Sequence, residues 1–413
     1  MEPQPYSPSP VAVFVLCCLV FLLSMFFRVS AAVISPELAA EFSLDSADLG
    51  RLSGAFFYAF AACQVPVGLA IDRLGPRRTV AALALVGAAG SLVFATATGF
   101  GAAVVGRVLL GVGMSSNLMG PLALLAAWFP PQRFATLSGT IVAIGSAGML
   151  LAATPLALLT RWLGWRYSFL VMAVVTALLG AAFYLVARDR PAGVQPPDRP
   201  TGNPLAGLGR LMRMPAYWAI SLATFIRYGA YMSLQGLWLA PLMTYGLGLT
   251  MVQAANGLLA MALGQMAGLP LFGMLSDRVL RSRKWTVAPS LLAMTAAVLA
   301  LVAVPRGLDL GWVMALCFFI GLAAAPGQIM YAHIKELVPA GRIGTAMTGI
   351  NMFTMLGPAA MMEAVGWVMT GEPAEYTSPS QFHPAWWFLA GALGLATLVY
   401  LAVPDSKALQ KNS

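Results

Sequence analysis

Apolar stretches of roughly 20 residues recur along the whole chain, and each is long enough to cross the ~30 Å hydrocarbon core of a bilayer. Only 9% of the 413 residues are charged, whereas about 25% is usual in a soluble protein. A backbone inside lipid must satisfy its own hydrogen bonds, so such stretches fold as helices. The sequence therefore predicts an all-α integral membrane protein.

Hydropathy and loop charge together predict twelve transmembrane helices. We place them at 11–36, 48–71, 79–98, 101–127, 134–159, 166–187, 216–241, 250–275, 285–305, 311–332, 343–369 and 384–404. Most of the 24 Lys and Arg then fall on loops that lie on the same side as both termini, which the positive-inside rule makes cytoplasmic. The net charge of +9 thus belongs to these loops and predicts no nucleic-acid partner.

The chain is expected to consist of two similar halves. The longest hydrophilic interruption, 188–215, is rich in Pro, Gly and Arg and is interpreted as a cytoplasmic linker between bundles at 1–187 and 216–413. "GLAIDRLGPRR" follows the second span and "GMLSDRVLRSRK" follows the eighth, so the same Gly-to-Asp-Arg spacing occurs once in each half. Internal repeats of this kind are typical of transporters with a site near the bilayer midplane.

These motifs resemble those of the major facilitator superfamily. The first copy matches the family's signature through Gly68, Asp72, Arg73, Gly75 and Arg78, and the second copy is looser. "GRVLLGVGMSSN" and "WLGWRYSF" are also similar to family motifs. The resemblance implies two pseudo-symmetric six-helix bundles that work by alternating access. It also implies a monomer in a bacterial inner membrane, with both termini in the cytoplasm.

Arg28 and Arg227 lie in the middle of predicted spans 1 and 7, at corresponding places in "FRVSAAV" and "IRYGAYM". An arginine at the bilayer centre costs about 2.5–3.5 kcal/mol and is tolerated mainly beside a polar cavity or partner. A guanidinium suits bidentate binding of phosphate or carboxylate. We predict that the two arginines bind an anionic substrate; the alternative is that backbone carbonyls or Glu363 cap them.

"FFRVSAAVISP" is similar to the first span of the organophosphate and organic-anion transporters within the superfamily. The chain departs from the proton symporters among them, because predicted spans 1 to 6 hold no mid-membrane Asp or Glu. It also lacks the histidine that glycerol-phosphate exchangers carry in span 5. These departures favour exchange or uniport over proton symport.

Other membrane-embedded polar groups complete the predicted site. Arg107 belongs to the family-like motif of span 4, where a structural and a substrate-binding role are both open, and Cys317 takes the matching place in span 10. Glu363 is the acid predicted inside a span of the second half; it is a candidate for proton coupling or for a gate. His333 is expected to be a solvated group at a helix end, and the alternative is a proton relay. The neutral candidates for orienting a ligand are Tyr58, Gln64, Asn117, Tyr228, Tyr231, Gln235 and Asn351.

A second group of charges is interpreted as conformational machinery. It comprises the cytoplasmic motif residues Asp72, Arg73, Arg77, Arg78, Asp277 and Arg278. Such pairs form charge-assisted contacts in one state and break them in the other. They are expected to alter transport rate more than ligand choice.

The function predicted is secondary transport of a small organic anion, a phosphate ester or a carboxylate, with protons or a counter-anion as coupling partner. The alternative is a multidrug or cation exporter of the same fold, and a third reading is a sensor built on a transporter fold. No phosphate-binding loop, metal-ligand spacing or nucleophile–base arrangement is found, so neither an enzyme nor a cofactor is predicted.

Overall fold

The structure is a computed structural model, and it describes residues 9–191, 211–338, 343–369 and 376–405. Every regular element within these ranges is helical. The chain divides into two compact units. Unit 1 takes its described residues from Met1–Ser30 and Ala55–Thr201, and unit 2 takes its residues from Ala31–Gly54 and Gly202–Ser413. The predicted linker, 188–215, lies largely outside the described residues.

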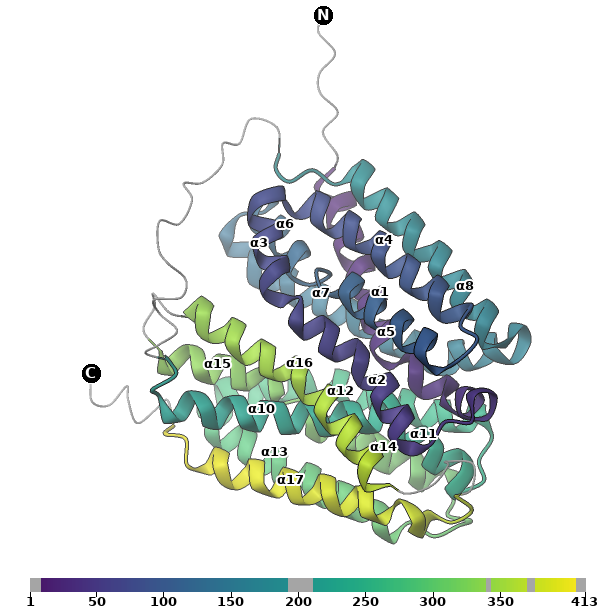
Figure 1. Ribbon diagram of the computed structural model, residues 1–413. Coiled ribbons are helices and arrows are strands. Elements are labelled where there is room, and N and C mark those ends of the chain that lie inside the picture. Colours follow the sequence, from purple (N-terminus) through teal and green to yellow (C-terminus); the bar gives the residue numbers. More distant parts are fainter. Residues whose placement is uncertain (1–8, 192–210, 339–342, 370–375, 406–413) are drawn as a thin grey trace, which may run out of the picture. The chain divides into compact units, whose positions relative to one another are not determined.

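The first eight helices occupy the purple-to-teal part of the chain in Figure 1. They are α1 Pro10–Phe42, α2 Ser46–Ala62, α3 Gln64–Leu74, α4 Pro76–Ala95, α5 Phe100–Met114, α6 Met119–Trp128, α7 Pro131–Leu151 and α8 Thr154–Val186. The C-terminal part of α1, from Ala31, and the N-terminal part of α2, up to Gly54, belong to unit 2. Gly75 and Gly164, both with φ near +80°, make the turn before α4 and the bend within α8. Glycine meets no steric penalty in that region of φ.

Unit 2 contains the remaining elements, and several of its helices change their winding within one span. They are α10 Pro215–Ser233, η1 Leu234–Trp238, α11 Leu239–Pro241, η2 Leu242–Gly246, α12 Met251–Met274, η3 Leu275–Val279, α13 Lys284–Ala300, η4 Leu301–Ala303, α14 Leu310–Ala324, α15 Gly327–Leu337, α16 Ile343–Val368, η7 Pro379–Phe382 and α17 His383–Leu401. The segments η1, η2 and η3 are π-helical. Such turns occur often at functional sites.

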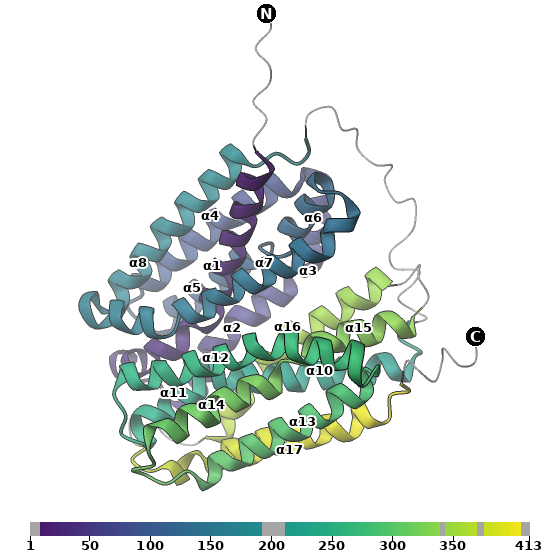
Figure 2. The same cartoon turned by 180° about the vertical axis from the view of Figure 1, so that it is seen from behind.

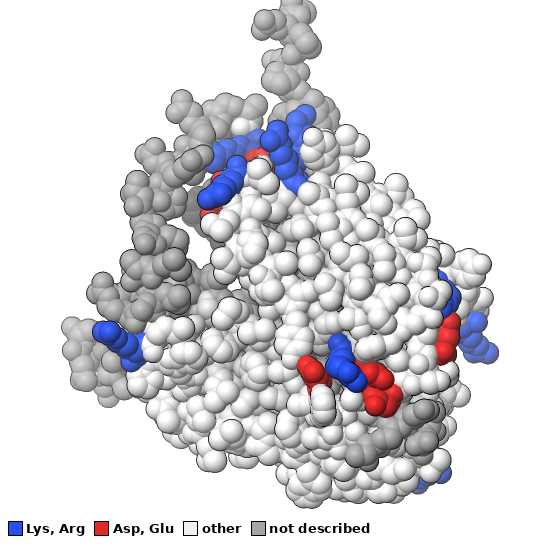
Figure 3. Space-filling view, viewed as in Figure 1, with Lys and Arg blue, Asp and Glu red and all other residues white. Residues whose placement is uncertain are grey.

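Eight helical stretches among the described residues are long and apolar enough to cross a membrane, and a ninth is reached if α2 and α3, bent by 43°, form one span. This count differs from the twelve predicted spans. Leu137–Val186 counts once although its backbone turns at Gly164, and α10, which carries Arg227, is not among the eight. Figure 3 shows that uncharged side chains cover most of the visible surface, as lipid-facing helices require.

Each unit is built from closely packed helix pairs. In unit 1, α4 lies between α5 and α8, and the ring of Phe94 packs 4.8 Å from that of Phe169. In unit 2, α10 packs on α16, α12 on α14 and α13 on α17. Figures 1 and 2 show α4 beside α8 and α13 beside α17 from both sides.

One glycine contact is repeated in the two units. A Cβ on Gly111 of α5 would overlap the backbone carbonyl of Phe56 on α2, and a Cβ on Gly321 of α14 would overlap that of Met261 on α12. The two copies of the Asp-Arg motif align Phe56 with Met261, and matching Arg107 to Cys317 aligns Gly111 with Gly321. The internal repeat therefore extends to individual helix–helix contacts.

Candidate functional site

Arg227 lies on α10 in unit 2 and is only 4% exposed. Its Nη1 donates a hydrogen bond of 2.6 Å to the carbonyl of Ala324, the last residue of α14. The chain breaks there and resumes as α15 at Gly327, so the Ala324 carbonyl can accept from a side chain. Nε of Arg227 is buried and has no hydrogen-bond partner among the described residues.

Gly327 provides the space that the Arg227 side chain occupies. A Cβ at this position would overlap the guanidinium carbon and both terminal nitrogens of Arg227. The guanidinium therefore lies directly against the backbone at the first residue of α15. Gly327 was not predicted from the sequence, because the role of a glycine that makes room for a side chain depends on tertiary structure.

Tyrosines surround this arginine. Tyr228 and Tyr231 lie nearly parallel, with ring centroids 6.4 Å apart, and the guanidinium carbon of Arg227 is 5.7 Å from the centroid of the Tyr228 ring. The hydroxyl of Tyr231 is buried without a hydrogen-bond partner among the described residues. Three of the residues predicted for the site, Arg227, Tyr228 and Tyr231, are thus brought together.

Asn351, also predicted for the site, belongs to a second polar group in unit 2. The hydroxyl of Tyr331 on α15 donates to Oδ1 of Asn351 at 3.2 Å and lies 2.7 Å from Oγ1 of Thr354. Tyr331 is one helical turn beyond Gly327 and therefore lies on the same face of α15. These hydrogen bonds link α15, whose first residue contacts Arg227, to polar side chains of α16.

No carboxylate compensates the charge of Arg227 in the described part of the chain. Ion pairs there include those of Arg51 with Asp48 and of Arg283 with both Asp277 and Glu336, and none of these involves Arg227. A buried charge without a counter-charge is strongly unfavourable. The arrangement is suited to an anionic ligand.

In unit 1, two arginines lie over phenylalanine rings of α2. The guanidinium carbon of Arg28 is 4.7 Å from the centroid of Phe60, and that of Arg107 is 4.9 Å from the centroid of Phe56. Arg107 is fully buried and donates from Nη1 to the carbonyl of Phe27 at 3.1 Å. Cation–π contacts of this kind hold a guanidinium in place against the aromatic ring.

The other neutral candidates make interhelical contacts or face outward. Asn117 donates from Nδ2 to the carbonyl of Val20 at 3.0 Å, and Gln64 donates to the carbonyls of Phe60 and Ser115. In unit 2, Gln235 of η1 donates to the carbonyl of Leu258 at 3.0 Å. Tyr58 is 41% exposed. Asn117, Gln64 and Gln235 thus donate to backbone carbonyls, and their part in ligand binding stays a prediction.

The charged motif of unit 2 forms a network at one end of the helices. Arg283 donates to Asp277, to Glu336 (Nε to Oε1, 2.9 Å) and to Oγ of Ser276 (2.9 Å). Arg278, named from the sequence, is exposed. Burial by itself lowers the pKa of Arg283, but its hydrogen bonds and charge contacts with Glu336 and Asp277 raise this pKa above its ordinary value. Arg283 belongs to the second motif copy, but its ion pairs with Asp277 and Glu336 were not predicted from the sequence.

The corresponding motif of unit 1 uses Asp189, which follows α8 and was not predicted. Its Oδ1 accepts from the backbone N–H of Arg77 at 2.7 Å, at the start of α4, where a carboxylate is favoured by the helix dipole. The Arg77 side chain donates from Nε to the carbonyl of Tyr184 at 2.6 Å and lies over the ring of Tyr184. Asp72, Arg73 and Arg78 are exposed.

The expectation that His333 is solvated was wrong. His333 is fully buried; its Nδ1 lies 2.7 Å from the hydroxyl of Tyr400 and its Nε2 lies 3.0 Å from the carbonyl of Pro404. Because a carbonyl only accepts, Nε2 carries a proton and donates it.

Glu363 is half-buried on α16. Glu37, placed just outside span 1 by the sequence, lies within α1, with Oε2 buried and unpartnered among the described residues.

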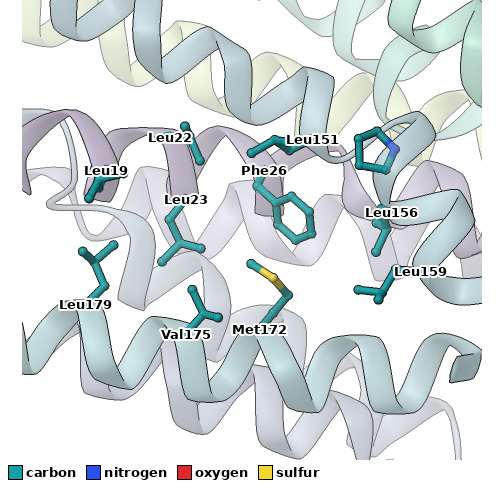
Figure 4. Close-up of a pocket in the computed structure, with 11 residues that line it drawn as sticks. Leu19, Leu22, Leu23, Phe26, Leu151, Leu156, Leu159, Met172, Val175 and Leu179 are labelled. Carbon is teal, nitrogen blue, oxygen red and sulfur yellow. The ribbon is translucent and has the colours of Figure 1, made fainter.

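None of these polar residues lines a pocket of about 370 Å³ in unit 1. Figure 4 shows side chains of α1 pointing toward those of α7 and α8 around it. Its lining consists of Leu19, Leu22, Leu23, Phe26, Leu151, Pro155, Leu156, Leu159, Met172, Val175 and Leu179. With an entirely apolar lining, this pocket offers no donor to an anion.

Comparison with known proteins supports the fold and the family. The chain is 30% identical to an MFS-type efflux pump of Mycolicibacterium smegmatis over 78% of this chain and 75% of that protein. It is 27% identical to the 3-(3-hydroxy-phenyl)propionate transporter of Escherichia coli over 85% and 86%. It is 25% identical to a probable sulfoacetate transporter of Cupriavidus necator over 63% and 64%.

The aligned region covers less than two thirds of some relatives: 64% of the sulfoacetate transporter and 38% of a nitrate/nitrite transporter of Picosynechococcus sp.. Among solved structures, the D-xylose–proton symporter superposes with a TM-score of 0.77 over 96% of this chain and 98% of that one, at 17% identity. This similarity shows the fold alone.

A family model provides the assignment. The model described as Major Facilitator Superfamily matches residues 16–362 and 220–413, which together include nearly the whole chain. The helical fold, the repeated glycine contact and the buried arginines are consistent with this match. The chain is an integral membrane protein that belongs to the Major Facilitator Superfamily.

Proposed function

We propose that this protein is a secondary transporter that moves a small organic anion across a bacterial inner membrane by alternating access. In this proposal the helices form twelve spans in two six-helix bundles, at 1–187 and 216–413, with both termini in the cytoplasm. Arg28 and Arg227 bind the anion, and Arg107, Tyr228, Tyr231 and Asn351 complete the site. Asp72, Arg73, Arg77, Arg78, Asp277 and Arg278 act in the conformational change.

The observation that carries the proposal is the environment of Arg227. Its guanidinium is buried, is held by one backbone carbonyl, and has no carboxylate partner among the residues described. A purely structural arginine would be expected to use all of its N–H groups in hydrogen bonds. Leaving a buried donor without an acceptor costs about 1–3 kcal/mol of stability, and more when the group is charged. An anionic ligand supplies the missing acceptors and the missing charge.

The names of the relatives support the same ligand class. They include transporters named for nitrate/nitrite, sulfoacetate, 3-(3-hydroxy-phenyl)propionate, galactarate or D-glucarate, and tartrate. Their common chemistry is a planar or tetrahedral oxyanion, which a guanidinium binds through two parallel N–H groups.

The test is a ligand panel on the purified full-length protein. The anions in these names and one phosphate ester are ranked by the rise in unfolding temperature, since a ligand that binds the native state stabilises it by mass action. For the best anion, Arg227→Lys and Arg28→Lys are each expected to weaken binding about tenfold or more, because lysine keeps the charge and loses the bidentate fork.

Arg161→Lys, at an exposed arginine of unit 1, is the matched control and is expected to bind like wild type. If no anion stabilises the wild-type protein, or if both site variants bind the best anion with wild-type affinity, the proposal is wrong.

A second function, export of cationic drugs, is favoured by the 30% identity to an efflux pump. A cationic substrate requires a carboxylate in the membrane, for which Glu37 and Glu363 are the half-buried candidates. Stabilisation of the protein by tetraphenylphosphonium, abolished in Glu37→Gln or Glu363→Gln and absent with every anion, would establish this function and exclude the first.

A further inference from the structure

The first turn of α15 carries backbone donors that lack acceptors. This 11-residue helix begins at Gly327, and the N–H of Ile329 bonds to the carbonyl of Pro326 at 2.9 Å. In the described part of the chain, no carbonyl outside the helix accepts from the N–H of Gly327 or Gln328. Such first-turn N–H groups have no partner within their own helix and form the positive end of its dipole.

The buried guanidinium of Arg227 lies beside the Cα of Gly327, the residue that carries the first of these donors. A Cβ built at residue 327 would overlap the guanidinium carbon, so the side chain of Arg227 is in contact with the backbone at the start of α15. Arg227 is 4% exposed, its Nη1 is held by Ala324, and its Nε has no acceptor within the described residues. A cation beside the positive end of a helix is unfavourable, so an anion that contacts both groups would remove the repulsion.

Unit 1 contains the equivalent helix break, between α5 and α6, and there the residue that corresponds to Gly327 is hydrogen-bonded. Aligning Arg107 with Cys317 matches Asn117 to Gly327 and Met114 to Ala324. There the N–H of Asn117 bonds to the carbonyl of Met114 at 3.2 Å, and its side chain bonds to the carbonyl of Val20 at 3.0 Å. Ser24, one turn before Arg28, reaches the Met114 carbonyl at 3.4 Å. The N–H at the position of Gly327 is therefore bonded in unit 1 and open in unit 2, whereas the N–H of Leu118, which corresponds to Gln328, has no backbone acceptor among the described residues either.

We propose that the oxyanion of the substrate binds at the N-terminus of α15, where the N–H groups of Gly327 and Gln328 and the guanidinium of Arg227 donate to its oxygens. This inference rests on the proposed transport of an anion and specifies its binding geometry in unit 2. Carboxylate, sulfonate and nitrate groups all present the two or three acceptor oxygens that these donors require. Tyr331, on the same face of α15, borders the rest of the ligand.

The first test is Gly327→Ala in the full-length protein. The new methyl group meets the end of a flexible side chain, so it displaces the guanidinium without requiring the backbone to move. Sulfoacetate and 3-(3-hydroxyphenyl)propionate are the probes, measured by calorimetry. Loss of one charge-assisted hydrogen bond predicts about tenfold weaker binding.

Gly349→Ala is the matched control. Its Cβ would meet the hydroxyl of Tyr217, also the end of a flexible side chain in unit 2, and it does not touch Arg227. We expect Gly349→Ala to bind each probe within about twofold of wild type, since distant sites act independently. Equal losses in the two variants would mean that general strain lowers the affinity, which would overturn the proposal.

The second test is backbone hydrogen exchange across 325–330 with and without a saturating anion. Donation from Gly327 and Gln328 to the ligand predicts slower exchange there, an effect that a purely structural role of Gly327 does not produce. Wild-type affinity in Gly327→Ala, or unchanged exchange, would overturn the α15 site, while loss of binding in Arg227→Lys would leave anion transport standing. If no anion binds the wild-type protein, both proposals are wrong.

Discussion

The two units contain the same helix break and use it differently. In unit 1 the break after Met114 is filled by the amide of Asn117, and the arginines Arg28 and Arg107 lie over phenylalanine rings instead. In unit 2 the break after Ala324 is followed by a glycine, and Arg227 lies in the space. Corresponding helix breaks can thus hold a polar side chain in one unit and leave room for an arginine in the other.

The contacts that the units share are those in which the backbone of one helix meets a glycine of another. Gly111 and Gly321 both allow a neighbouring carbonyl to approach their helix. Small residues at helix interfaces drive association in membranes, because no hydrophobic effect operates between apolar helices in lipid. The contacts that the two units share therefore maintain helix packing, and the positions at which they differ, such as Asn117 and Gly327, can vary without disturbing these contacts.

The largest expected effect comes from breaking this shared contact. Gly111→Ala and Gly321→Ala each introduce a methyl group against a backbone carbonyl that cannot move alone. Overpacking of this kind costs about 1–3 kcal/mol of unfolding free energy. We expect equal losses in the two units, measured as unfolding temperature in detergent.

Gly101→Ala on α5 and Gly273→Ala on α12 serve as controls, because a Cβ at either position meets open space. There the better helix propensity of alanine should leave stability unchanged or raise it by up to about 1 kcal/mol. A loss at Gly111 with none at Gly321 would contradict the structural equivalence of the two pairs.

A smaller effect is expected from exchanging the residues that distinguish the breaks. Asn117→Gly removes the hydrogen bond to Val20 and should destabilise the protein by about 1 kcal/mol without loss of anion binding. Gly327→Asn should instead abolish anion binding, because its side chain overlaps the place of the Arg227 guanidinium. Binding calorimetry and thermal unfolding on the same two variants separate these outcomes. Loss of binding in Asn117→Gly, with binding retained in Gly327→Asn, would reverse the roles assigned to the two units.

The sequence predicted the membrane class, the repeat and the intramembrane arginines, because these follow from hydropathy and spacing alone. The assignment of the chain to the superfamily was confirmed, whereas substrate binding by Arg28 and Arg227 stays a prediction. The expectation that His333 is solvated was wrong, because its burial depends on the hydroxyl of Tyr400 and the carbonyl of Pro404, both distant in sequence.

Asp189 and Gly327 were not predicted for the same physical reason. Asp189 acts through the backbone N–H of Arg77, and Gly327 acts through the side chain it lacks. Neither role leaves a local pattern in the sequence. Residues that work through backbone groups of another helix become visible only in the folded chain.

The smallest expected effect concerns the charged ends of the two units. Arg283→Gln removes ion pairs to Asp277 and Glu336, whose side chains are 60% and 30% exposed, so the loss in stability should be about 0–1 kcal/mol and should vanish in high salt. Asp189→Asn in unit 1 removes a carboxylate from the start of α4, where helix dipole and hydrogen bond act together, and should cost about 1 kcal/mol with weaker salt dependence. Unfolding temperatures of both variants, measured at low and at high salt, distinguish an end held by ion pairs from one held by a helix cap. Equal salt dependence in the two variants would mean that both ends are held in the same way.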